Sequence, residues 1–271
     1  MIALPVVYSN NFENTVSPFG WTGINQTAGI VTVSSDHPYT GSYNAYVTLN
    51  AGAVAGSYAG FYQSYAGTPN RAHIFIRAMN VMVDQLPANE NGRLPVHGCW
   101  VQPSAEMIGN CGFTKVGGVL KWFNYYRHNG TFVFQTGGTP QLNTLYCVEL
   151  EVRQNSASGV ADGAQRLWVN GTLVLEVTGL INDDRIVNYL VFGLMNAEGN
   201  ATNPIHFWGD SYVVADGYIG PESGNPWVTV NSSPELNVPV YVDGQFIGNT
   251  PIAVSIPSGT HTVRVESEVT R

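Results

Sequence analysis

The chain has 271 residues, of which 44% are hydrophobic and only 11% are charged, so one large all-β domain with a sizeable core fits within it. The formal net charge is −8 with only 11 lysines and arginines, which excludes the basic surface that nucleic-acid binding needs. No stretch approaches the roughly 20 apolar residues of a membrane helix, so a membrane span is not expected.

The first part of the chain alternates apolar and polar residues in short runs, which is the pattern of β-strands with one buried face. A turn at Gly41-Ser42 leads into one such strand, and Ile74, Ile76 and Ala78 share one face of another. Pro and Asn residues predict a long loop from 84 to 98. The strands and the turn segment expected up to this loop cover residues 6–13, 29–33, 37–49 and 73–83.

The middle of the chain contains a predicted hairpin. Runs at 119–127 and 131–134 flank the turn signal His128-Asn129-Gly130, and shorter strands at 99–102 and 107–114 precede them. Aromatic residues fall on both faces of the run at 119–127. One set is therefore expected in the core, and the other is expected to face water or a partner.

Three cysteines lie in this part of the chain. Cys99 and Cys111 are twelve residues apart across a segment that resembles a loop, and a loop of this size closes readily in an oxidising compartment. The spacing predicts a disulfide between them, with Cys147 left alone. Because no CxxC pair occurs, the cysteines do not indicate a metal site.

The clearest alternation lies at 145–177. Val148 and Leu150 fall on one face, whereas Glu149 and Glu151 fall on the other, and Asn170-Gly171 is a hairpin turn. Strands at 187–196 and 205–214 follow. No segment keeps a helical i, i+3, i+4, i+7 pattern over three turns, so the predicted fold is all-β.

The order of the segments LYCVELEV, RLWVNGTLVLEVTGL, VNYLVFGLMN and IHFWGDSYVVADGYIGP resembles the second half of a concanavalin A-like, laminin-G-like β-sandwich. The likeness covers roughly residues 6 to 220. It implies a two-sheet jelly-roll domain at 1–220. The resemblance is specific for the fold and says little about activity.

The same resemblance implies a structural calcium ion where the first strand, the Gly-Ser turn and the last strand meet. Calcium takes six to eight oxygen ligands, including carboxylates. The matching positions here are Glu13, Ser42, Asn44 and Asp210. The alternative is that Glu13 and Asp210 are simply hydrogen-bonded or solvated carboxylates.

The end of the chain resembles a PEGA domain. A linker is predicted at 221–226, and the match to the family lies in Ser233-Pro234, Val240 to Gly244, Thr250-Pro251 and Pro257 to Val263. The Pro-Glu-Gly-Ala motif itself is not intact, because Leu236 and Asn237 follow Pro234-Glu235. The resemblance implies a small β domain at 227–271 that decorates bacterial or archaeal surface proteins.

Catalysis is not expected. Retaining glucanases of this fold use a Glu-x-Asp-x-(x)-Glu strand, but Glu149-Leu150-Glu151 lacks the aspartate and has Arg166 as an expected ion-pair partner. A polysaccharide lyase needs a base beside a group that neutralises a uronate. The chain supplies those residue types without a lyase motif around them, at His97, Arg77, Tyr125, Tyr126 and Arg127.

The sequence therefore predicts a non-catalytic extracellular or cell-surface protein of a prokaryote for adhesion or assembly. Glycan contact is expected through exposed aromatics, although core packing is the alternative for each of them. The competing hypothesis is a structural subunit that associates with copies of itself. The candidate stacking residues are Trp100, Trp122, Tyr125, Tyr126 and Trp168.

Secretion is inferred from the low charge alone, since residues 1–7 are too short for a signal peptide and lack a charged region. Glycosylation sequons fit a secreted glycoprotein. A chain rich in Asn and Thr also produces such sequons by chance. They begin at Asn25, Asn129, Asn170, Asn200 and Asn231.

Overall fold

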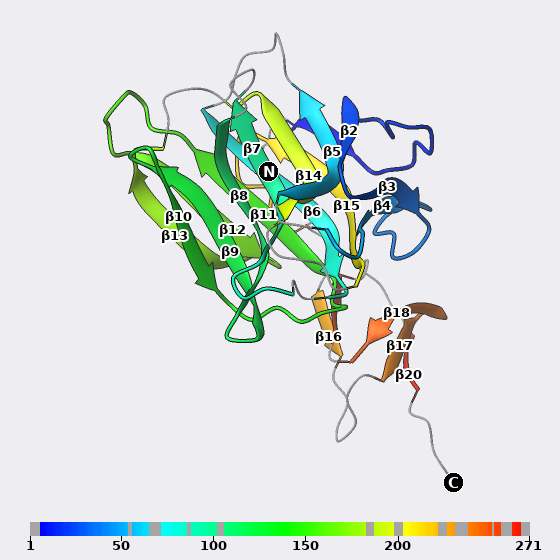
Figure 1. Cartoon of the computed structure of the whole chain (residues 1–271). Helices are drawn as coiled ribbons and strands as arrows, with labels where there is room; N and C mark the ends of the chain where they lie inside the picture. Colours follow the sequence, from blue (N-terminus) through cyan, green and yellow to red (C-terminus); the bar gives the residue numbers. More distant parts are fainter. Residues whose placement is uncertain are drawn as a thin grey trace.

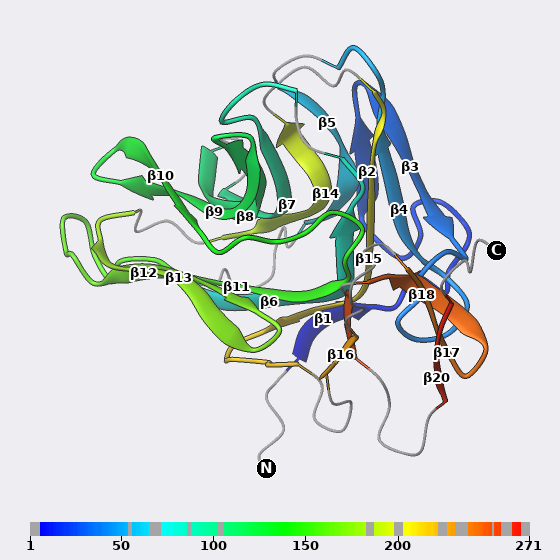
Figure 2. The same ribbon diagram turned by 90° about the horizontal axis from the view of Figure 1, so that it is seen from below.

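The computed structural model describes residues 6–53, 56–64, 72–85, 88–101, 106–182, 187–197, 203–221, 227–230, 238–250, 252–255 and 262–266. These residues form strands, turns and loops without any helix, which confirms the all-β prediction. Accordingly, no helix in these ranges has the length and hydrophobicity of a membrane span. Two large sheets face each other, and a group of short strands follows at the C-terminal end (Figures 1 and 2).

The first sheet has eight strands in the order β13-β12-β11-β6-β15-β4-β3, with β1 also paired to β15. All of these pairs are antiparallel. Its strands are β1 (Val6–Asn10), β3 (Gly29–Ser34), β4 (Asn44–Leu49), β6 (His73–Val83), β11 (Tyr146–Arg153), β12 (Gly163–Val169), β13 (Thr172–Leu180) and β15 (Ile205–Ala215).

The second sheet has seven antiparallel strands in the order β10-β9-β8-β7-β14-β5-β2. Some neighbouring strands come from distant parts of the sequence, such as β15 beside β4 and β6, as in a jelly roll. Its strands are β2 (Gly23–Gln26), β5 (Ser57–Ser64), β7 (Arg93–Val101), β8 (Glu106–Val116), β9 (Val119–His128), β10 (Thr131–Gly137) and β14 (Tyr189–Ala197).

The hydrophobic core is formed by side chains of both sheets, which lie one above the other in Figure 2. Ile74, Ile76 and Ala78 of β6 are fully or almost fully buried, as their shared face predicts. From the other sheet, Phe113 and Trp122 are cross-strand partners, and both belong to this core. Each sheet thus contributes one alternating set of side chains to the core.

The predicted loop at 84–98 is wrong over its second half, because β7 already begins at Arg93. Pro95 lies in this strand, next to a shift in the β7–β8 register between Pro95 and His97. A bulge of this kind tolerates a residue that cannot donate to the ladder. Pro95 therefore marks an irregularity within a strand and not a loop.

The C-terminal strands form two small sheets, β16-β19 and β18-β17-β20. β17 and β18 are antiparallel neighbours joined by a tight turn at Asp243-Gly244. Residues 222–226 of the predicted linker lie outside the described residues, and the domain boundaries stay a prediction. The strands are β16 (Trp227–Val230), β17 (Pro239–Val242), β18 (Gln245–Asn249), β19 (Ile252–Ser255) and β20 (Val263–Val265).

Candidate functional site

The outer surface of the seven-stranded sheet carries a band of aromatic side chains that we call the aromatic face. Trp100 alternates with the core residue Cys99 and is paired with Tyr189, which alternates with the core residue Leu190. In β9, Trp122 and Tyr126 lie on the buried side, and Tyr125 lies on the opposite side. The aromatic face consists of Tyr62, Trp100, Tyr125, Phe132, Phe134 and Tyr189.

One half of the aromatic face lies over β5, β7 and β14. The rings of Tyr62 and Tyr189 stack at 5.1 Å and 17°, and the Asn25 amide donates a hydrogen bond of 3.0 Å to the Tyr189 hydroxyl. The Trp100 indole lies over Gly98, where a Cβ would come within 2.2 Å of it. Burial raises the pKa of Tyr189 to about 12, so this phenol stays neutral and can donate a hydrogen bond.

The other half lies over β9 and β10. Tyr125 and Phe132 stack at 5.1 Å, and the Arg93 guanidinium lies 3.8 Å from the centre of the Tyr125 ring. Arg93 thus covers an aromatic ring in a cation–π contact. Lys121 and Arg127 alternate with the inward residues of β9 and share the side of Tyr125, so this half is basic as well as aromatic.

The predicted stacking role is wrong for two of the five residues, because their side chains are buried. Trp122 is only 3% exposed and Tyr126 only 8%, and Trp122 packs on Phe113 at 4.4 Å. Trp168 lies on the other sheet, between Phe75 and Tyr218. The structure therefore brings only Trp100 and Tyr125 to the aromatic face.

The four predicted calcium ligands gather around the turn that precedes β4. Glu13 Oε1 accepts the backbone N–H groups of Ser42 and Tyr43 at 2.8 and 2.9 Å. Asp210 Oδ2 accepts those of Tyr39 and Thr40 at 2.6 and 3.1 Å. These bonds show that both carboxylates already have partners in the protein.

Two further observations fit a hard cation at this cluster. Both polar atoms of the Asn44 side chain are buried and have no hydrogen-bond partner among the described residues. Burial raises the pKa of Asp210 to about 6, and the nearby negative charge of Glu13 adds to the shift. Carboxylate, amide and backbone oxygens are the ligands that calcium takes. No group of three or more His, Cys, Asp or Glu that could hold a metal occurs within the described residues, so any such site would need amide or backbone oxygens.

The predicted ion pair with Arg166 is confirmed for Glu151. Its carboxylate lies 2.8 Å from Arg166 and 2.8 Å from His73, and Arg166 also contacts Glu176 at 2.7 Å. This network holds β6, β11, β12 and β13 together on the outer side of the eight-stranded sheet. The interactions are those of a structural charge network.

Glu149 has a different environment, which the sequence did not predict. It is buried and accepts the backbone N–H groups of Ile219 and Gly220 at 2.7 and 2.8 Å. Arg77, also buried, donates to the Gly220 carbonyl at 3.0 Å. We call residues 216–221, which cross this sheet, the linker strap.

The residue types of a lyase are not brought together. His97 lies between the sheets, 3.3 Å from the Val148 carbonyl, and burial lowers its pKa to about 3. Arg77 holds the linker strap on the far side of the other sheet. Only Tyr125 and Arg127 share the aromatic face.

The predicted disulfide is absent, since Cys99 and Cys111 are buried cysteines that are not bonded to each other. Cys99 is paired with Gly109, and Cys111 with His97. The two thiols are therefore diagonal neighbours on adjacent strands, and diagonal side chains lie about 7–8 Å apart, farther than a disulfide spans.

Three of the five sequons lie in described residues. Asn25 is part of β2 beside the aromatic face, whereas Asn129 and Asn170 occupy hairpin turns with positive φ. Asn200 and Asn231 lie outside the described residues. Glycosylation at these positions stays a prediction.

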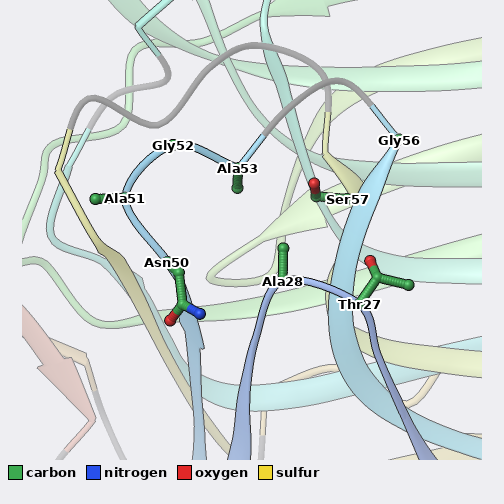
Figure 3. Close-up of a pocket in the computed structure, with 8 residues that line it drawn as sticks. All are labelled: Thr27, Ala28, Asn50, Ala51, Gly52, Ala53, Gly56 and Ser57. Carbon is green, nitrogen blue, oxygen red and sulfur yellow. The ribbon is translucent and has the colours of Figure 1, made fainter.

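A separate open hollow of about 500 Å³ lies at the sandwich rim, between the turn after β2 and the loop after β4. Figure 3 shows its lining residues, which are small or amide side chains. They are Thr27, Ala28, Asn50, Ala51, Gly52, Ala53, Gly56 and Ser57. Since none of them is aromatic or ionisable, this hollow lacks the chemistry of the aromatic face.

Comparison with known proteins separates the two parts of the chain. A family model described as PEGA domain matches residues 226–269. No curated protein matches the chain. Solved structures match much of the chain, at identities that establish the fold alone.

Three of these structures illustrate the likeness. The cellulose induced protein Cip1 has a TM-score of 0.58 at 14% identity, covering 79% of this chain and 100% of that chain. An endo-beta-1,4-glucuronan lyase from the fungus Trichoderma reesei has a TM-score of 0.57 at 12% identity, covering 78% and 96%. The alginate lyase vAL-1 from Chlorella virus has a TM-score of 0.52 at 12% identity, covering 78% and 100%.

Proposed function

We propose that this chain is a non-catalytic extracellular protein of the prokaryotic cell surface that binds an anionic glycan on its aromatic face. The observation that carries the proposal is that Tyr, Trp and Phe rings gather on one side of the seven-stranded sheet, with Arg93 stacked on Tyr125. Sugar rings stack on such aromatic surfaces, and the polar edges of Tyr and Trp bind their hydroxyl groups. The concanavalin A-like resemblance and the PEGA match support a surface role.

The charge of the aromatic face selects the class of glycan. Arg93, Lys121 and Arg127 bring positive charge to one end of a protein whose net charge is −8. A guanidinium pairs with a carboxylate through directional hydrogen bonds. Two of the similar structures are lyases named for glucuronan and alginate, both of which are polymers that carry carboxylates.

A binding role is favoured over lysis by the positions of the ionisable groups. Tyr189, a phenol of the aromatic face, has a pKa raised to about 12 by burial, whereas a general base works best with a pKa near the working pH. His97 is enclosed between the sheets. The aromatic face therefore offers stacking and charge without a poised base.

Binding of glucuronan and alginate oligosaccharides by calorimetry tests this proposal. Trp100→Ala or Tyr125→Ala is expected to weaken the affinity about tenfold, which corresponds to about 1.4 kcal/mol. Arg93→Ala is expected to weaken it as well and to reduce its salt dependence. Trp168→Ala, a tryptophan change on the other sheet, is the matched control and should leave affinity unchanged.

Three outcomes would contradict the proposal. Unchanged affinity in all the aromatic-face variants would remove this surface as the site. Ultraviolet absorbance from an unsaturated uronate product would show a lyase instead. Large oligomers in light scattering, without glycan binding, would favour the structural-subunit hypothesis.

We also propose that Glu13, Ser42, Asn44 and Asp210 hold a structural calcium ion. The support is the gathering of these oxygen donors and the unpaired buried amide of Asn44. Bound calcium would tie the turn at 39–43 to β15. It would act on stability and not on chemistry.

A further inference from the structure

A second aromatic cluster lies on the outer side of the eight-stranded sheet, across the sandwich from the aromatic face. Trp208 of β15 is the cross-strand partner of Tyr46 in β4, and His206 is the partner of Thr48. All three rings alternate with core residues such as Phe207 and Val47. We call Tyr46, His206 and Trp208 the second platform.

The three rings of this platform form a joined surface. Tyr46 and His206 are nearly parallel, at 5.8 Å and 10°, a spacing that corresponds to laterally offset rings. Trp208 lies 5.3 Å from Tyr46 and 5.9 Å from His206. His37 packs its edge against Trp208 at 5.7 Å. Each ring is half-buried, so its exposed part is held in place by its neighbours.

The polar groups beside the rings are acceptors and an unmet donor. Asp84 accepts the backbone N–H of His206 at 2.8 Å and contacts its Nδ1 at 2.5 Å. With Nδ1 bonded to Asp84, the other ring nitrogen of His206 can accept a hydrogen bond. Trp208 Nε1 is enclosed and has no acceptor among the described residues, a need that a buried bridging water can meet.

We propose that the second platform binds a neutral sugar ring. Carboxylate and imidazole acceptors suit hydroxyl donors, and aromatic rings suit the apolar face of a pyranose. The acidic groups near this side that lie outside the proposed calcium site are Asp84 and Asp36. Their negative charge disfavours a uronate, in contrast to the basic aromatic face.

The two surfaces then differ in both position and specificity. They lie on opposite sides of one sandwich, so one molecule can hold a charged glycan and a neutral glycan at once. A protein of this kind joins two polymers without any catalytic step. This inference does not depend on the aromatic face, because each surface has its own residues and its own ligand class.

Titration with cellohexaose, a neutral glucose oligosaccharide, and with an alginate hexasaccharide tests the second platform on the full chain. We expect Trp208→Ala and Tyr46→Ala to weaken cellohexaose binding at least tenfold and to leave alginate binding unchanged. Asp84→Asn is expected to weaken cellohexaose binding severalfold. Trp168→Ala, a tryptophan change on the same side of the same sheet, should change neither affinity.

Loss of folding in one variant does not prevent the test, because Trp208→Phe keeps a ring for packing and removes the indole. It should weaken cellohexaose binding by a smaller factor than Trp208→Ala. The proposal is wrong if the wild-type chain binds no neutral oligosaccharide, or if all the platform variants bind cellohexaose like the wild type. It is also wrong if the platform variants lose alginate binding instead.

Discussion

Replacing Glu149 with alanine is expected to lower the free energy of unfolding by about 3 kcal/mol at about pH 5 and to free the linker strap. The change removes the acceptor of the Ile219 and Gly220 N–H groups. Chemical denaturation measures the loss, and limited proteolysis at residues 216–221 detects the freed strap.

The matched control is Glu176→Ala on the same side of the same sheet. Glu176 forms an ion pair with Arg166, but its side chain is 45% exposed. Exposed pairs contribute at most about 1 kcal/mol, so this variant should resist the protease like the wild type. Equal behaviour of the two variants would show that Glu149 does not hold the strap.

The contribution of Glu149 to the free energy of unfolding decreases as pH rises. Burial raises the pKa of Glu149 from 4.5 to about 7, although the strap N–H groups and Arg77 act against the shift. Because the folded protein binds this proton more tightly than the unfolded chain, the contribution is complete below about pH 4.5 and is lost as pH rises through about 7. Glu149→Ala should therefore reduce the fall in stability between these pH values. An unchanged pH profile would contradict the assignment.

Calcium is expected to raise the melting temperature of the chain by about 5 to 10 °C. At a concentration of about 100 times the dissociation constant, a ligand adds about 2.7 kcal/mol to stability. In a domain of this size each kcal/mol corresponds to about 2–4 °C. Thermal denaturation with calcium and with chelator measures the shift.

Glu13→Gln should abolish most of that shift, because it removes an exposed carboxylate from the proposed ligand set. Asp36→Asn is the matched control, since Asp36 is an exposed acid in the same loop region but not a proposed ligand. It should keep the full response to calcium. A wild-type chain that melts at the same temperature in calcium and in chelator would refute the proposed ion.

The all-β fold was predictable from the sequence, because the alternation of apolar and polar residues recurs in many strands. Which face of a single strand is buried was not predictable in every case. In β9 both faces are rich in aromatic residues, so periodicity does not tell which face is buried. The buried Asn124 shares the inner face with Trp122, whereas Tyr125 faces outward beside Arg93. Only the register with β8 decides the matter.

The candidate surfaces depend on contacts between distant residues. Tyr62 meets Tyr189, and Glu149 meets Gly220, pairings that no local pattern indicates. The gathering of the four proposed calcium ligands was predictable, because the family resemblance places the first strand, the Gly-Ser turn and the last strand at one site. The second platform was missed because Tyr46, His206 and Trp208 become neighbours only when β15 is placed beside β4.

The position of β15 also governs the order in which the chain can fold. This strand is hydrogen-bonded to β1, β4 and β6, all of which precede it by well over a hundred residues. During synthesis, the edges of these three strands that pair with β15 remain without their partner until residues 205–215 leave the ribosome. Long-range pairing of this kind slows folding and prolongs exposure of strand edges. A chaperone that shields the nascent N-terminal strands should therefore increase the yield of folded protein.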